Sequence, residues 1–243
     1  MNRPQIRPAR PAVPPGTDST RFAEVLGQAA EAPDLRKTER TRLKLLAAAA
    51  ALLADRGEPA ALRVSDVADR AGVAHGTFYR YFADRIALVE ALIEDFARFL
   101  RERMSKVREG APGSRPRVGA TTLVYVRLFR DNPGLMRCLM GLGAESAAFR
   151  ARFHALNRDW NYRVAAAIAA RRADVAHERP AAPETLLPLA YALGGMIDEF
   201  LAQLYLRRDP ALAALADDEP AVADLLSELW CRGAYSNGPK SLH

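Results

Sequence analysis

Apolar residues recur along most of this chain with the three- and four-residue spacing of amphipathic helices. The firmest example is 37–56, where Leu43, Leu46, Ala47, Ala50 and Ala54 share one face and Gly57 follows as a stop signal. The same spacing predicts further helices over 64–71, 75–81, 85–107, 117–130, 133–142, 145–173, 183–206 and 220–234. No run alternates with the period of a strand, so the predicted fold class is all-α.

The N-terminal segment has a different composition. Residues 1–17 contain five prolines with arginines between them and no acid, which predicts a disordered or extended chain. Residues 19–30 have the spacing of a short helix that Pro33 would end. For domain organisation we assign the whole of 1–35 to a flexible arm rich in proline and arginine.

Composition narrows the class of protein. With 243 residues and 49% hydrophobic residues the chain can bury a sizeable core, and its net charge is +6. Between Arg36 and Lys44, five basic residues face a single acid; such a cluster fits a polyanion or a solvated helix end, and charge alone leaves both readings open. Two cysteines outside any CxxC pair favour a reducing, cytoplasmic compartment. The longest apolar run has ten residues, too few for a membrane span, so no membrane partner is expected.

Residues 62–82 read LRVSDVADRAGVAHGTFYRYF and have the pattern of a helix-turn-helix. Gly72 opens the turn because glycine adopts a positive φ without penalty. Phe78 and Phe82 lie four residues apart and are predicted core residues, whereas Tyr79 and Tyr81 lie off that face. The start of the second helix is the end that faces base edges in the major groove.

The order of motifs from residue 71 to 82, AGVAHGTFYRYF, followed by Asp84-Arg85 and Leu88, resembles the signature of the TetR family of transcriptional regulators. The resemblance covers residues 38–88 and implies a three-helix helix-turn-helix DNA-binding domain over 36–84, joined to a larger helical ligand-binding and dimerisation domain over 85–243. It implies a homodimeric, sequence-specific transcriptional regulator, a repressor that a small-molecule effector releases from double-stranded operator DNA.

The resemblance also implies roles for single residues. His75 would read a base, Tyr79 would contact a base methyl group or the backbone, Tyr81 would hydrogen-bond a phosphate, and Arg85 would pair with one. Gly76 and Thr77 would lie against the DNA backbone.

Two positions depart from the family pattern. Arg63 and Ala74 stand where the family has Ser or Thr, so both short helices lose an ordinary N-cap acceptor. Two substitutes remain open: Ser65 caps the first helix one or two residues late, or Arg63 itself contacts a phosphate. We therefore include Arg63 and Ser65 among the candidate DNA-binding residues.

The C-terminal half resembles the family more loosely, through the phrases NPGLMR, GGMIDEFL and ELWCRGAY. By resemblance, the last two long helices would form the dimer interface, with Leu189, Ala192, Gly195, Leu225, Leu229 and Trp230. An effector pocket would lie among the helices at 117–130, 145–173 and 183–206. Its candidate apolar walls are Tyr125, Phe129, Phe153, Trp160, Met196 and Phe200, and its candidate polar groups are His154, Asn157 and Asp198.

Two other classes of function stay open. One is a helical small-molecule-binding or catalytic protein that has lost DNA binding, and the other is a constitutive DNA binder with little sequence preference. The sequence contains no GxSxG, P-loop or dinucleotide-binding motif, and neither His154 nor His177 belongs to a metal-ligand pattern. We therefore expect no enzyme activity, no cofactor and no metal site.

Overall fold

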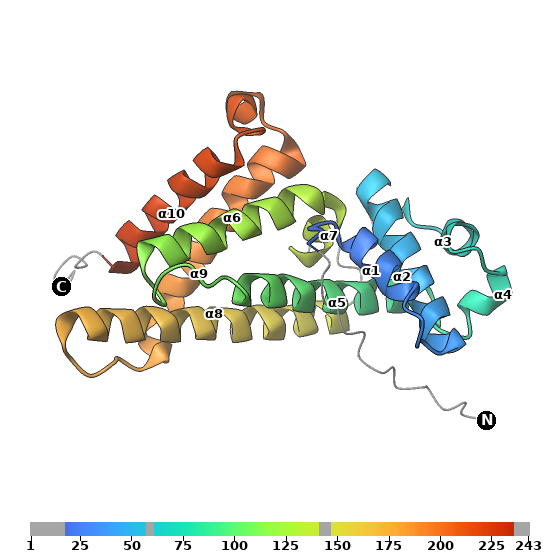
Figure 1. Cartoon of the computed structure of the whole chain (residues 1–243), viewed down its shortest axis with the longest axis horizontal. Helices are drawn as coiled ribbons and strands as arrows, with labels where there is room; N and C mark the ends of the chain where they lie inside the picture. The colour runs from blue at the N-terminus through green and yellow to red at the C-terminus, as the bar shows by residue number, and fades with distance from the viewer. Residues whose placement is uncertain (1–17, 57–60, 141–146, 236–243) are drawn as a thin grey trace. The chain divides into compact units, whose positions relative to one another are not determined.

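The computed structural model describes residues 18–56, 61–140 and 147–235, and these residues form helices without a strand (Figure 1). The prediction for residues 1–17 lies outside them. The α-helices are α1 (Phe22–Ala30), α2 (Lys37–Arg56), α3 (Val64–Arg70), α4 (His75–Phe78), α5 (Arg85–Ser105), α6 (Arg115–Asp131), α7 (Pro133–Leu139), α8 (Ala147–Ala176), α9 (Pro183–Leu201) and α10 (Glu219–Tyr235). The predicted all-α class is confirmed.

Most helices begin and end within a few residues of the predicted positions. Two helices differ from the prediction in their length or type. The second short helix was predicted to reach residue 81, but α4 ends at Phe78 and a turn follows. The helix predicted over 183–206 is α-helical to Leu201 and then widens into a π-helix over Ala202–Arg207. A 3₁₀-helix over Pro210–Leu215 lies between the helices predicted over 183–206 and 220–234.

The described residues divide into two compact units. Unit 1 contains 18–56, 61–99 and 131–140, and unit 2 contains 100–130 and 147–235. This differs from the sequence-based boundary after residue 84, because the first part of α5 and all of α7 pack with the helix-turn-helix.

In unit 1, α1 is part of the core, so the prediction of a flexible arm over 1–35 was wrong for these residues. Phe22 is 2% exposed, and its ring lies 5.4 Å from that of Phe96 and 5.0 Å from that of Phe99. Arg40 ties down the C-terminal end of α1, because its guanidinium donates to the carbonyls of Ala30 and Ala32, each at 3.1 Å. Burial of its apolar face therefore fixes α1 to the core, although the sequence around it is polar.

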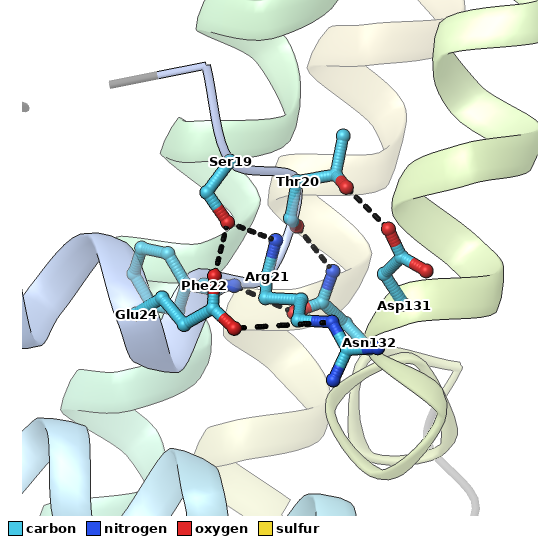
Figure 2. Close-up of polar contacts among 7 residues, drawn as sticks. All are labelled: Ser19, Thr20, Arg21, Phe22, Glu24, Asp131 and Asn132. Carbon is cyan, nitrogen blue, oxygen red and sulfur yellow. Dashed lines mark hydrogen bonds and ion pairs between the residues drawn. The ribbon is translucent and has the colours of Figure 1, made fainter.

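Asn132 anchors the chain just before α1 (Figure 2). Its Oδ1 accepts the backbone N–H of Phe22 at 2.8 Å, and its Nδ2 donates to the carbonyl of Thr20 at 2.7 Å. The Thr20 hydroxyl donates to Asp131, which ends α6. Asn132 is 4% exposed, so both ends of its amide are satisfied inside the protein. The described N-terminal end is thereby fixed to the corner between α6 and α7.

Helix α7 approaches α2 at backbone distance. A Cβ atom on Gly134 would lie 2.1 Å from the carbonyl oxygen of Leu53, so only glycine fits there. Leu135 and Met136 are buried beside it.

Unit 2 is held together where α8, α9 and α10 meet. Its core cluster comprises Ala165, Ile168, Ala169, Leu186, Ala190, Leu193 and Ala234. A Cβ atom on Gly233 would lie 2.7 Å from Leu193 Cδ2, which brings α10 close to α9. Glu219, at the start of α10, forms ion pairs with Arg127 and Arg130 of α6.

Candidate DNA-binding surface and effector site

The turn between α3 and α4 depends on Gly72. Its φ is +66°, and its N–H donates to the carbonyl of Asp69 at 3.1 Å. The Val73 N–H then donates to the carbonyl of Ala68 at 3.0 Å. Ala68 and Phe78 are fully buried, so the two short helices are packed against each other.

Both helices lack a side-chain cap, as the sequence predicted. The N-cap residues are Arg63 for α3 and Ala74 for α4, and neither makes a side-chain capping hydrogen bond. The hydroxyl of Ser65, one of the two substitutes left open, donates to Asp66 Oδ1 at 3.2 Å. Because no cap supports these helices, the turn and the buried apolar face carry their stability.

The residues of α4 and of the turn after it divide clearly into buried and exposed groups. Phe78 and Phe82 are 0% and 5% exposed, as predicted for core residues, whereas Tyr79 is 52% exposed. His75 is also exposed, and its ring meets that of Tyr79 edge-on at 5.4 Å. The other candidate DNA-binding residues are exposed (Arg63, Ser65 and Gly76) or half-buried (Thr77, Tyr81 and Arg85). Arg80, which sequence reasoning did not select, is exposed between the two tyrosines.

Three of the five basic residues over 36–44 contact groups of the same chain, whereas Arg36 and Lys37 are exposed. Arg42 lies 3.6 Å from the buried carboxylate of Asp95 and 5.6 Å from the centre of the Phe82 ring. Arg40 caps α1, and Lys44 pairs with Glu31 at 3.3 Å. Fewer of these positive charges are therefore available to a polyanion than the number of basic residues suggests.

In unit 2, the predicted pocket residues Tyr125 and Asp198 form a hydrogen-bonded pair. The Tyr125 hydroxyl donates to Asp198 Oδ1 at 2.7 Å, between α6 and α9. Burial raises the pKa of Asp198, and the bond from Tyr125 offsets part of that rise. Burial also raises the pKa of Tyr125 well above its usual value, and the charge of Asp198 adds to the rise. Phe129 packs edge-on against Tyr125 at 6.1 Å.

A second buried polar group lies on α8. Asn161 is 5% exposed, and its Nδ2 donates to the backbone carbonyl of Asn157 at 2.9 Å and to its Oδ1 at 3.0 Å. Its Oδ1 would lie 3.5 Å from a Cβ atom on Gly194 of α9. Asn157 was predicted and Asn161 was missed, although a second asparagine one turn along the same helix was the available signal.

The remaining pocket candidates are spread over α8 and α9. Trp160, Met196 and Phe200 are half-buried, and His154 is exposed in a single chain. The side chain of Phe153 lies outside what the structure describes. Within the described residues, no group of three histidine, cysteine or acidic side chains is placed to hold a metal ion.

The predicted interface residues on α9 and α10 remain largely uncovered. Leu225 and Leu229 are each 41% exposed, and Ala192 and Gly195 are exposed. Leu189 and Trp230 are half-buried against the core cluster. The stretch Pro183–Arg207 is apolar enough to cross a membrane by length and composition, yet only 33% of its most apolar window is buried in one chain.

Comparison with known proteins finds relatives of this chain among bacterial transcriptional regulators. The sequence model of the bacterial regulatory proteins of the tetR family matches residues 45–92. The chain is 28% identical over 188 residues to the HTH-type transcriptional regulator EthR of Mycolicibacterium smegmatis, covering 74% of this chain and 80% of that protein. It is 38% identical over 102 residues to an HTH-type transcriptional regulator of Mycobacterium tuberculosis, which spans 41% of this chain and about half (49%) of that protein.

Solved structures share the fold. A TetR-family regulator from Rhodococcus sp. has a TM-score of 0.61 at 22% identity, with 80% of this chain and 98% of that chain covered. The regulator FadR from Bacillus subtilis, solved in complex with stearoyl-CoA, has a TM-score of 0.60 at 18% identity, with 79% and 98% covered. The family match falls on the glycine turn and the helices that flank it, and the likeness in fold covers about four fifths of this chain. This chain therefore belongs to the TetR family of DNA-binding transcriptional regulators.

Proposed function

We propose that the protein is a dimeric, cytoplasmic repressor that holds operator DNA with α3 and α4 and releases it when a small molecule binds in unit 2. The observation that carries the DNA-binding part is the division within α4 and the turn after it. Phe78 and Phe82 hold the helix to the core, while His75 and Tyr79 stand exposed beside each other. An exposed aromatic pair formed by the first residue of α4 and the residue that follows this helix fits a surface that reads base edges.

Gly76 supports the same proposal. A Cβ atom there would meet no atom within 4 Å, so nothing in the described chain requires glycine at this exposed position. A helix that presses against a DNA backbone gives a reason for the small residue, because even a methyl group would hold the two surfaces apart. His75, next to it, is then placed to reach a base, and Arg85, at the start of α5, to reach a phosphate.

Arg85→Ala and His75→Ala should weaken operator binding in different ways. The arginine variant should lose affinity on every sequence and lower the slope of log affinity against log salt by about one unit, because one phosphate contact is lost. The histidine variant should change the preference at one base pair per half-site, where a misread pair costs about 1–3 kcal/mol. Fluorescence anisotropy over a salt series, on the protein's own upstream DNA and on single-base variants of it, measures both.

Each variant serves as the control for the other. An unchanged salt slope for Arg85→Ala would exclude its phosphate contact, and equal losses on all sequences for His75→Ala would exclude base reading. If the parent protein binds no upstream DNA in this assay, the alternative of a ligand-binding protein without DNA affinity is favoured.

The effector site is proposed around Tyr125 and Asp198. A half-buried carboxyl group with a raised pKa and a tyrosine partner is costly to a folded protein, and such pairs recur at functional sites. Asn161 of α8 meets α9 at Gly194. Asn157 lies one turn before Asn161 on α8, and Asp198 lies one turn after Gly194 on α9. Polar groups from α6, α8 and α9 therefore gather in one part of unit 2, beside Phe129. An apolar site with a few convergent polar groups fits a small organic effector.

Asp198→Asn should make the protein more stable near neutral pH. The folded state raises the pKa of Asp198 above its unfolded value of 3.8, so this group favours folding at low pH and opposes it as the pH rises through the raised value. Asparagine keeps an oxygen that accepts from Tyr125 and has no charge to bury. Thermal denaturation over a pH series should show a higher midpoint for the variant at neutral pH and a gap that narrows toward the ordinary aspartate pKa. A gap that does not depend on pH would contradict burial of an ionisable carboxyl group.

A further inference from the structure

A pocket lies at one end of unit 2, and none of its lining residues belongs to the proposed effector site. It is formed by the last turns of α8, the start of α9, the loop before α6 and the C-terminal end of α10. Its volume is about 460 Å³. Pockets of this size hold small organic ligands in other proteins.

Positive charge dominates the polar part of the lining. The charged residues in contact with the pocket are Arg115, Arg171, Arg172, Arg179 and Glu178. Arg115 pairs with Glu228 at 2.6 Å, although its own side chain is 70% exposed, and Glu178 is the one acid among the residues that line the cavity. Guanidinium groups bind carboxylates and phosphates through paired hydrogen bonds, which makes an anion the expected ligand.

These arginines differ in how firmly they are held. Arg172 is fixed, because its Nε donates to the carbonyl of Ala234 at 2.6 Å. Arg171 pairs at 2.7 Å with Asp174, whose side chain is 72% exposed, and a pair of this kind contributes little stability. Arg179 makes no hydrogen bond or ion pair with any described residue. At least one guanidinium group at the pocket is thus available to a ligand.

The loop before α6 supplies an unsatisfied hydroxyl group. The Ser114 Oγ atom is buried and has no hydrogen-bond partner, although such groups normally have one. The preceding Gly113 has a φ of +73°, and a Cβ atom there would lie 2.9 Å from Arg171 Cβ and 3.0 Å from the Tyr235 hydroxyl oxygen. The glycine therefore lets the loop close against the basic wall, while the Ser114 Oγ atom is packed beside Gly110.

The rest of the lining is apolar. Ala169, Ala173 and Leu186 present hydrocarbon to the cavity. We propose that this pocket binds a small organic anion, whose carboxylate or phosphate group lies against Arg172 and Arg179 and whose apolar body lies against these residues. The pocket would be a second small-molecule site, distinct from the one around Tyr125 and Asp198.

Isothermal titration calorimetry on the full chain tests this proposal with benzoate and phenyl phosphate, and with benzyl alcohol as the neutral analogue. At least one anion should bind at one site per chain, and the alcohol should bind at least about tenfold more weakly. Arg179→Ala should weaken anion binding about tenfold, the usual effect of losing one charge-assisted contact. Ala176→Trp should abolish it, because the indole fills the cavity while every arginine remains.

Arg158→Ala is the matched control, since Arg158 is an exposed arginine of α8 that does not line the pocket. It should leave anion binding unchanged, and so should Asp198→Asn, which alters only the proposed effector site. Circular dichroism and operator binding of Arg179→Ala and Ala176→Trp should match the parent protein. Binding of one anion alone would identify the ligand as a carboxylate or as a phosphate. Anion binding that survives Ala176→Trp, equal binding of benzyl alcohol, or no saturation up to about 10 mM would overturn the proposal.

Discussion

Gly195→Glu should convert the protein from dimers to monomers and lower operator affinity by about 1,000-fold or more, toward the level of non-specific binding. A Cβ atom on Gly195 meets nothing within 4 Å, so the glutamate fits within one chain. It also replaces a glycine inside a helix by a better helix former. Any loss must therefore come from a partner subunit. Light scattering measures the oligomeric state, and anisotropy measures operator binding.

The physical basis is the uncovered apolar surface of α9 and α10. Leu225 and Leu229 of α10 are each 41% exposed. Helix α9 belongs to the apolar stretch Pro183–Arg207, and only 33% of the most apolar part of that stretch is buried in one chain. A single chain in water leaves this surface exposed at a cost, and a two-fold contact between copies covers it on both.

Leu225→Asp/Leu229→Asp tests the α10 side of the same surface and should give the same result. Ala170→Glu, at an exposed alanine of α8, is the control and should remain dimeric. A monomeric parent protein, or a Gly195→Glu variant that stays dimeric, would contradict the proposed interface. If the parent protein instead partitions with membranes, the apolar stretch has a different role.

Local patterns predicted much of unit 1 because local forces decide it. The glycine turn at Gly72 and the contrast between Phe78 and Tyr79 follow from residue type and helical spacing, and the structure has both. The same spacing predicted a short helix over 19–30, but the proline-rich composition before it led us to assign this helix to a flexible arm and not to the core. Its stability comes from Phe96 and Phe99, which are more than seventy residues away in sequence.

Features that depend on distant segments were beyond the sequence. Asn132 satisfies backbone groups 110 and 112 residues earlier, and nothing in its own neighbourhood indicates those partners. Arg42 belongs to a basic cluster by sequence, yet it turns inward to Asp95, because a count of charges does not say which face of a helix is covered. The arginine-lined pocket of unit 2 likewise combines segments around 114, 172, 186 and 235, which only the fold brings together.

Gly134→Ala should destabilise unit 1 by about 3 kcal/mol or more, a large loss for one methyl group. Helix propensity alone predicts the opposite sign, because alanine favours a helix over glycine by about 1 kcal/mol. The new Cβ atom would lie 2.1 Å from the carbonyl oxygen of Leu53 and 2.6 Å from its carbon, and backbone atoms inside α2 cannot turn aside as the end of a side chain can. Helix α7 must then move away from α2, which opens the core around Leu135 and Met136.

Gly27→Ala is the matched control for this substitution. Gly27 lies inside α1, and a Cβ atom there meets nothing within 4 Å, so this variant should gain about 0.5–1 kcal/mol. In thermal denaturation, Gly134→Ala should lower the midpoint by about 6–12 °C, while Gly27→Ala should raise it by about 1–4 °C. Hydrogen exchange should locate the loss from Gly134→Ala in α2 and α7. If both variants melt at or above the parent midpoint, α7 does not approach α2 at backbone distance. Opposite shifts would establish that the glycine in NPGLMR is required by packing, independently of any contact with DNA or effector.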